Sequence, residues 1–199
     1  MKRDSEMKVI IPKRRHEETL TYRVVVTDRN GKVLDDISAP SRSYVKQWNQ
    51  ILNVQADQTT ETIKDITGAN RTIEERTSNL EAKYALYGVR VGKGSTPVTI
   101  NDYKLEAACG AGTGVDQFNH QANYYTVPAV VGSTCSFTLK RTLINNSGAI
   151  ITGVIELGVY VEMYGTDYLG LGFRDVLGAG VDVPDGGAIT VEYTIGVTV

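Results

Sequence analysis

The last eleven residues alternate strictly between apolar and polar side chains, and this pattern constrains the fold more than any other feature of the sequence. A period of two residues is typical of a β-strand with one buried and one wet face. We therefore expect residues 189–199 to be paired inside a sheet. The apolar positions are Ile189, Val191, Tyr193, Ile195, Val197 and Val199.

Further segments of strand length precede this one, beginning near residue 84. They end at clusters of Gly, Asn, Asp, Ser or Pro, which are typical of turns. Regular strands between turn clusters predict a mainly β fold, and specifically a β-sandwich of jelly-roll or immunoglobulin-like type. The segments are residues 84–91, 122–131, 133–143, 150–163 and 168–176.

Residues 1–16 are basic, with six Lys or Arg side chains against two acidic ones. They contain little apolar content beyond Val9, Ile10 and Ile11. A segment of this composition cannot bury enough surface to fold alone. We predict a flexible basic arm over residues 1–20, which is either a solvated tail or a segment that docks on a neighbouring subunit or an acidic surface.

Residues 21–80 are predicted to form a hairpin, a helix and a short β segment. Strands at 22–26 and 32–37 flank Asn30-Gly31, a dipeptide that supplies the positive φ angles of a tight turn. Residues 62–66 and 71–74 predict a second small hairpin or a linker. The boundary with a β-sandwich domain over residues 81–199 is expected near residue 80.

One stretch has the period of an amphipathic helix, with its apolar residues on one face. Ser38 or Ser41 could cap this helix, and we expect Trp48, the sole tryptophan, to be a packing anchor on its buried face. The residues at helical spacing are Tyr44, Val45, Trp48, Ile51, Leu52 and Gln55.

Composition places the 199-residue chain in the ordinary soluble globular class, with 41% hydrophobic and 22% charged residues. A formal charge of −2 does not favour a nucleic-acid partner. We find no apolar run long enough to cross a membrane and no apolar signal segment, so we expect a cytoplasmic protein. Cys109 and Cys135 are then expected to be thiols that act as small packing residues.

The sequence offers no set of residues with the spacing of a catalytic or metal site. His16 and His120 lie in the basic segment and in a predicted loop, without identifiable partners. Asp102, Glu106 and Asp116 could supply a carboxylate pair or a calcium site, but their intervals match no calcium loop, and solvated loop acids are the simpler interpretation. We predict that the chain is not an enzyme and has no catalytic, cofactor-binding or metal-binding residues.

Two glycine-rich stretches resemble nucleotide loops only superficially. Residues 88–95 have three residues between the first two glycines of the pattern and a glycine after the lysine, which departs from a phosphate loop. Residues 110–114 lack dinucleotide spacing and are expected to form a mobile loop. Five tyrosines could line a carbohydrate groove, but interface or core positions are favoured; they are Tyr124, Tyr125, Tyr160, Tyr164 and Tyr168.

Several stretches look like parts of a known class of protein. Residues 137–148 (FTLKRTLINNSG) continue into 154–160 (VIELGVY), and residues 173–177 (FRDVL) precede 183–187 (VPDGG) and the terminal strand. Together with residues 41–48 (SRSYVKQW), they resemble segments of small structural proteins of tailed phages. The resemblance covers most of residues 38–199, implies a role in the virion, and implies no site residues.

We therefore expect a phage virion structural protein that is assembled in the host cytoplasm. It would form homo-oligomers and dock on other virion proteins of the capsid, neck or tail, for instance as a capsid decoration protein, without a membrane or a specific nucleic-acid partner. The alternative is a carbohydrate-binding or receptor-binding β-sandwich module that uses the loops at residues 109–121 and 164–168. A hydrolase with a buried carboxylate pair is a third reading, for which the sequence offers no candidate pair.

Overall fold

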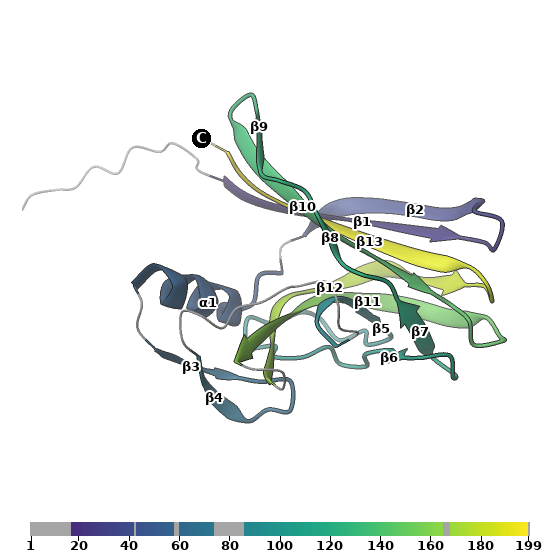
Figure 1. The fold of residues 1–199 in the computed structure, drawn as a ribbon, viewed down its shortest axis with the longest axis horizontal. Coiled ribbons are helices and arrows are strands. Elements are labelled where there is room, and N and C mark those ends of the chain that lie inside the picture. The colour runs from purple at the N-terminus through teal and green to yellow at the C-terminus, as the bar shows by residue number, and fades with distance from the viewer. Residues whose placement is uncertain (1–16, 42, 58–59, 74–85, 165–167, 199) are drawn as a thin grey trace, which may run out of the picture.

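The computed structural model describes residues 17–41, 43–57, 60–73, 86–164 and 168–198. Within these ranges the chain is mainly β, with one short helix and sheets of eight, three and two strands (Figure 1). The prediction of a mainly β fold with one helix is confirmed. Among the described residues, no helix has both the length and the apolar character needed to cross a bilayer.

The terminal strand lies in the middle of the eight-stranded sheet, here called the large sheet. Strand β13 (Ala188–Thr198) pairs antiparallel with β1 (Glu17–Thr27) on one side and with β10 (Thr134–Ile144) on the other, along its whole length. The expectation that this strand is paired inside a sheet is therefore confirmed. The other strands are β2 (Val33–Ser41) beside β1, and β6 (Gly110–Ala111), β7 (Gln117–His120), β8 (Tyr124–Tyr125) and β9 (Ala129–Val131) on the side of β10.

Strands β1 and β2 form the hairpin that Asn30-Gly31 predicts. Gly31 adopts a φ of 79°, and the Asp28 carboxylate accepts hydrogen bonds from the amides of Asn30 and Lys32. A glycine is favoured there because other residues rarely adopt positive φ. Both strands are longer than predicted, because β1 pairs with β13 as well as with β2.

The N-terminal region differs from its prediction in two ways. Residues 17–20 of the predicted arm are paired strand, since β1 begins at Glu17. Ser38 and Ser41 lie in β2 and cap no helix, because the helix begins only at Lys46. Residues 1–16 and the predicted boundary near residue 80 lie outside the described residues.

The three-stranded sheet, here called the small sheet, has β11 (Ile151–Tyr164) between β5 (Gly88–Gly92) and β12 (Tyr168–Val183). Strand β11 matches the predicted segment 150–163. Strand β12 runs seven residues past the predicted end at residue 176, through a stretch that glycines interrupt. The predicted strand 122–131 is instead two short strands, β8 and β9, separated by residues 126–128.

The two sheets pack against each other around one apolar core, to which β1, β10 and β13 contribute from the large sheet and β5, β11 and β12 from the small sheet. A hydrogen bond inside this core also joins the sheets: the Tyr193 hydroxyl of β13 donates to the buried Asp175 carboxylate of β12 at 2.9 Å. The Ser41 hydroxyl donates to the same carboxylate oxygen at 2.9 Å. Burial raises the pKa of Asp175 above its ordinary value, against the effect of these hydrogen bonds.

Helix α1 (Lys46–Asp57) lies against β12 and beside the small hairpin of β3 (Glu61–Lys64) and β4 (Asn70–Ile73) (Figure 1). Trp48 packs on Phe173 of β12 with ring centroids 4.7 Å apart, as expected of a packing anchor, but its side chain is only half-buried. Leu52, which the helical period placed on the buried face, is 44% exposed. The prediction was wrong for Leu52 because the helix has protein on only part of the face that its apolar residues span.

The loop between β3 and β4 depends on one buried carboxylate. Asp65 is 2% exposed, and it accepts hydrogen bonds from the amides of Thr67 and Ala69 and from Arg71. Burial alone would raise the pKa of Asp65, but the hydrogen bonds from Thr67, Arg71 and Ala69 outweigh it and lower the pKa to about 2. The ionised form therefore stabilises the hairpin.

We predict that this stabilisation is present above pH 4 and is lost as the pH falls toward 2. The folded-state pKa lies below the ordinary value of 3.8, so protonation of Asp65 costs about 2 kcal/mol of hairpin stability. Hydrogen exchange of the Ile63 and Ile73 amides measures it, with Asp65→Asn as the control that removes this titration. An equal pH dependence in both proteins between pH 4 and 2 would contradict the assignment.

Candidate functional site

At one end the large sheet and the small sheet diverge, so that this end of the large sheet projects away from the core (Figure 1). In Figure 1 the ends of β9 and β13 rise away from the ends of β11 and β12, on the side where α1 lies. The inner face of the large sheet, which the small sheet covers over most of its area, is therefore uncovered at this end. The uncovered part is the candidate site, here called the open groove.

The exposure of β13 shows where the cover ends. On its inner face Tyr193 is fully buried, Ile195 is half-buried, and Val197 is 47% exposed. The register places Cys135 of β10 opposite Val197, and Val130 of β9 opposite Cys135, so these three side chains form one cross-strand row. Val130 is 71% exposed. The apolar alternation of β13 thus continues beyond the part of the strand that its own chain buries.

Helix α1 provides the second wall of the open groove. Tyr44, Trp48 and Leu52 face the sheet residues Phe137 and Ile195 across a cavity of about 380 Å³. Tyr44 and Trp48 are stacked at 6.0 Å, and both rings contact Phe173. The wall is therefore held in place by the core, while Leu52 at its rim remains exposed.

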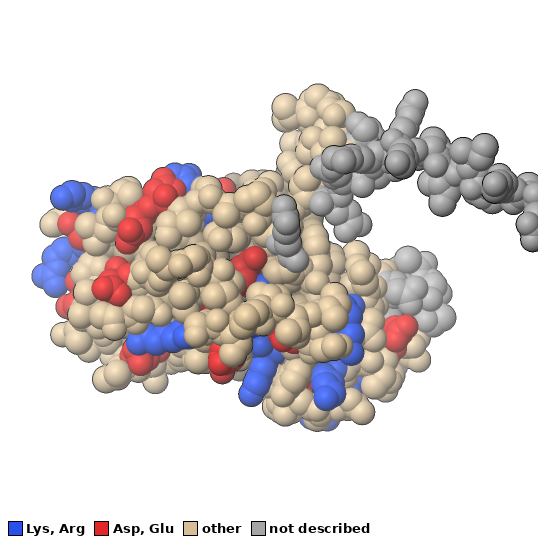
Figure 2. Space-filling view, turned by 180° about the vertical axis from the view of Figure 1, so that it is seen from behind, with Lys and Arg blue, Asp and Glu red and all other residues tan. Residues whose placement is uncertain are grey.

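The projecting end carries no charge over long stretches of its strands. Residues 121–139 and 193–199 contain no Asp, Glu, Lys or Arg, whereas β1 brings Glu17 and Glu18 to this end, in register with Thr198 and Val197. Figure 2 shows the projection as an uncharged region above a body on which acidic and basic side chains are interspersed. Val127 and Val131 add exposed apolar surface next to the groove. An uncovered apolar sheet end of this kind typically marks an interaction surface, because an edge strand normally carries charge or cover.

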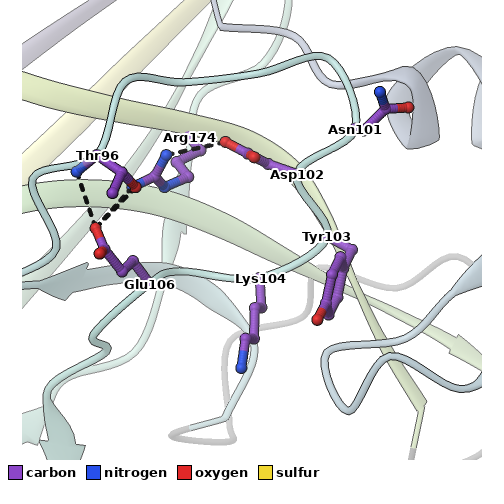
Figure 3. Close-up of a pocket in the computed structure, with 7 residues that line it drawn as sticks. All are labelled: Thr96, Asn101, Asp102, Tyr103, Lys104, Glu106 and Arg174. Carbon is purple, nitrogen blue, oxygen red and sulfur yellow. Dashed lines mark hydrogen bonds and ion pairs between the residues drawn. The ribbon is translucent and has the colours of Figure 1, made fainter.

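A second, polar pocket of about 180 Å³ lies on the small sheet, on the face away from the large sheet. It surrounds Arg174 of β12, which is 2% exposed, and the loop of residues 93–108, here called the 93–108 loop, covers it (Figure 3). Asp102, Glu106 and Thr96 of this loop approach the guanidinium. The fold therefore places the buried Arg174 cation beside the carboxylates of Asp102 and Glu106.

The central contact of this pocket is between Arg174 and Glu156 of β11, which is 0% exposed. Arg174 Nε donates to Glu156 at 2.7 Å, and Nη1 donates to Asp102 at 2.9 Å. The amides of Gly94, Glu106 and Ala107 also donate to Glu156. The Glu156 carboxylate therefore ties the 93–108 loop to the small sheet through both its ion pair and the loop backbone.

The charges in this pocket satisfy one another. Burial would raise the pKa of Asp102, but hydrogen bonds from Thr99 and Arg174 outweigh it and hold the pKa below its ordinary value. Each nitrogen of the Arg174 guanidinium already donates within the chain, the third of them to Thr96. The guanidinium charge is therefore compensated within the chain, and the pocket stabilises the fold.

The acids proposed from the sequence lie in different surroundings. Asp102 and Glu106 both pair with Arg174, so the interpretation as solvated loop acids is wrong for Asp102, whose side chain is only 20% exposed. Asp116 pairs with Lys93. Among the residues that the structure describes, no group of three or more His, Cys, Asp and Glu is arranged to hold a metal ion.

The glycine-rich stretches and the histidine also have defined places. Residues 88–92 are strand β5, and the amide of Gly94 donates to Glu156. Residues 110–111, predicted as part of a mobile loop, form β6 and pair with β7. His120 ends β7 and is not in a loop, because Leu143 of β10 pairs with it; His16 lies outside the described residues.

The cysteines and tyrosines are dispersed. Cys109 and Cys135 are free thiols, as expected; Cys109 lies in the core and Cys135 in the wall of the open groove. Burial raises the pKa of Cys109 to about 11. Tyr160 is buried beneath the 93–108 loop, whereas Tyr124 is 58% exposed on the large sheet. The described tyrosines therefore do not meet in one groove; Tyr168 packs its ring on Arg71, and the Tyr164 side chain lies outside the described residues.

Sequence reasoning missed Arg174 and Glu156 as a buried pair. The available signal was a single acid inside the apolar run 154–161, since a charge among Val, Ile and Leu on a central strand needs a partner. Comparison of the chain with protein-family models, curated proteins and solved structures finds no match.

Proposed function

We propose that this chain is a structural subunit of a tailed-phage virion, which acts by assembling with copies of itself and by docking on capsid, neck or tail proteins. The observation that carries the proposal is the open groove. The apolar side chains of the inner sheet face continue from the core into the groove. Val197 and Val130 belong to this face and are exposed, although their apolar character predicts burial. A contiguous apolar surface of this kind is stabilised when a protein partner buries it.

Two further observations support the proposal. The Arg174 and Glu156 network ties the 93–108 loop to the small sheet, as suits a scaffold for assembly. The resemblance of residues 38–199 to small structural proteins of tailed phages favours the virion as the setting. Within this proposal the packed sheets are a sandwich of jelly-roll or immunoglobulin-like type, residues 1–16 are its basic arm, and the subunit catalyses no reaction and is assembled in the host cytoplasm.

Light scattering over a range of concentrations tests the proposal. We expect masses above that of one chain and, by electron microscopy, rings or particles. Val130→Lys should weaken association at least about tenfold, because charge would enter a buried apolar contact, a loss equivalent to about 1.4 kcal/mol. Val115→Lys is the matched control, since Val115 is 86% exposed and lies outside the open groove.

A strict monomer at high concentration, with no incorporation into larger assemblies, would contradict the proposal. If that monomer bound a glycan array, the carbohydrate-binding alternative would replace it.

A further inference from the structure

We infer that the open groove receives the N-terminal segment, residues 1–16, of a second copy of this chain, with Val9, Ile10 and Ile11 filling the cavity. The inference rests on the proposed self-assembly and specifies which parts of two copies meet. It combines the chemistry of the groove, the composition of the segment, and the place from which the segment leaves the sheet.

The groove selects an apolar occupant. One wall is the inner face of β10 and β13, the other is Trp48 and Leu52 of α1, and the stretches 121–139 and 193–199 supply no charge to pair with. Glu18 of β1 is in register with Val197 at one edge of the groove, but a charged side chain deeper in the cavity, between Trp48 and Phe137, would lose its hydration without a partner. The occupant must therefore present several adjacent apolar side chains on a segment narrow enough to lie between a sheet and a helix.

Residues 9–11 meet this requirement. They are three consecutive β-branched residues, and Lys8 and Lys13 flank them closely. Long lysine side chains can bury their methylene groups at a rim while the ammonium stays in water. The segment would thus place its apolar residues in the cavity and its positive charges outside it. Docking in the groove would also explain why the apolar run of residues 9–11 occurs in an otherwise basic segment.

The direction of β1 favours a second copy over the same chain. Glu17 pairs with Thr198 at the projecting end of the large sheet, and β1 runs from there toward the core. A segment that continued β1 backward beyond Glu17 without a bend would point away from the core. Ile11 lies six residues before Glu17 and can therefore reach about 20 Å beyond the sheet. A neighbour's groove is accessible without the reversal of direction that self-docking requires.

The contact would be heterologous, because each copy offers a segment to one neighbour and a groove to another. Such head-to-tail contacts generate closed rings or open filaments, depending on the rotation between copies. Docking would also cover Val197 and Val130, the most exposed members of the cross-strand row. One segment thus accounts for both the uncovered apolar face and the apolar run that precedes β1.

Site-directed cross-linking of full-length chains tests the inference, because Cys135 already lies in the groove wall. The donor chain carries Ile10→Cys and Cys135→Ser, and the acceptor is the wild-type chain with an affinity tag that changes its size. After mixing and mild oxidation with copper phenanthroline, we expect a donor–acceptor disulfide dimer on a non-reducing gel. Cys109 is buried and has a raised pKa, so it should not compete.

Two controls accompany the donor. A chain with Val115→Cys and Cys135→Ser exposes a thiol far from the groove and should give at least about tenfold less dimer. Adding Leu52→Lys to the acceptor should reduce the cross-link by a similar factor, since it places a charge at the groove rim. Leu52 is exposed, so this substitution should leave the melting temperature unchanged.

The outcomes separate the inference from the proposed function. Oligomers by light scattering without a donor–acceptor cross-link would overturn the inference and leave the self-assembly proposal standing. A disulfide within single chains carrying Ile10→Cys and an intact Cys135, with no mixed dimer, would show that the segment occupies its own groove and would also overturn it. Monomers without any cross-link would remove both.

Discussion

A chain that ends at Gly187 should not fold. It lacks β13, which lies between β1 and β10 and pairs with both over eleven positions each. Ile189, Val191 and Tyr193 are fully buried, and burying each such side chain stabilises a fold by about 1.5–3 kcal/mol. The three together approach the whole stability of a typical domain, about 5–15 kcal/mol. Loss of Tyr193 would also remove a donor from the buried Asp175 carboxylate.

Circular dichroism and urea unfolding of the truncated chain measure this effect. The matched control ends at Gly196 and removes only residues beyond the buried part of β13, including the exposed Val197. We expect the control to unfold cooperatively near the wild-type midpoint and the longer truncation to show no transition. A cooperative transition in the chain that ends at Gly187 would show that the large sheet closes without its central strand.

Replacing Arg174 by methionine should destabilise the fold by about 3–5 kcal/mol, the usual cost of removing one partner of a buried ion pair. The guanidinium is the ionic partner of Glu156, and both side chains are almost completely buried. Without it, the Glu156 carboxylate stays in the interior, with hydrogen bonds from three backbone amides of the 93–108 loop but no cation beside it. The 93–108 loop would also lose its contact through Asp102.

Arg23→Met is the matched control for this substitution. Arg23 donates two hydrogen bonds to Asp36, so this pair resembles that of Arg174 in its chemistry. Both side chains are about half exposed, however. Exposed pairs typically contribute about 0–1 kcal/mol, so the control should change the free energy of unfolding by no more than that. Similar losses in the two variants would mean that burial does not distinguish these pairs. The double substitution Arg174→Met with Glu156→Gln should recover part of the loss, because it removes the uncompensated charge.

The elements with a clean period could be predicted from the sequence alone. Residues 189–199 alternate without interruption, and the structure pairs β13 as expected, because a single buried face imposes the period of two. The seven additional residues of β12 were hidden by Gly178 and Gly180, which have low strand propensity and lie at an irregularity of the ladder, between Val176 and Val181, which both pair with β11. The extension of β12 therefore depends on its pairing with β11 and not on the strand propensity of its own residues.

The pocket around Arg174 could not be predicted in the same way. Glu156 and Arg174 meet because Gly158 pairs with Arg174 across two strands, and this register is known only once the hairpin is placed. Asp102 arrives from a loop without periodic structure. Propensities of single residues contain no information on which distant side chains meet. The sequence therefore showed Glu156 as an acid in an apolar run, but it did not show that Arg174 is its partner.

The sequence contained one sign of the open groove, because the apolar alternation of residues 189–199 continues to the last residues of the strand. What the pattern could not show is that the two sheets diverge at this end (Figure 1), where Ile195 is half-buried and Val197 is 47% exposed. The same difficulty explains Leu52, whose helical position predicted burial. A periodic pattern indicates that a face is meant to be covered, but it does not indicate whether the cover belongs to the same chain.

The placement of β13 beside β1 has a consequence for how the chain reaches its native state. Thr27 pairs with Ala188, 161 positions later, so the central ladder of the large sheet closes one of the longest loops the chain contains. Contacts of this separation slow folding, because the entropy of loop closure is lost before the pairing compensates for it. Before β13 pairs with β1, the β1–β2 hairpin has an unpaired edge. Pairing of this edge with a strand of another newly made chain would compete with folding.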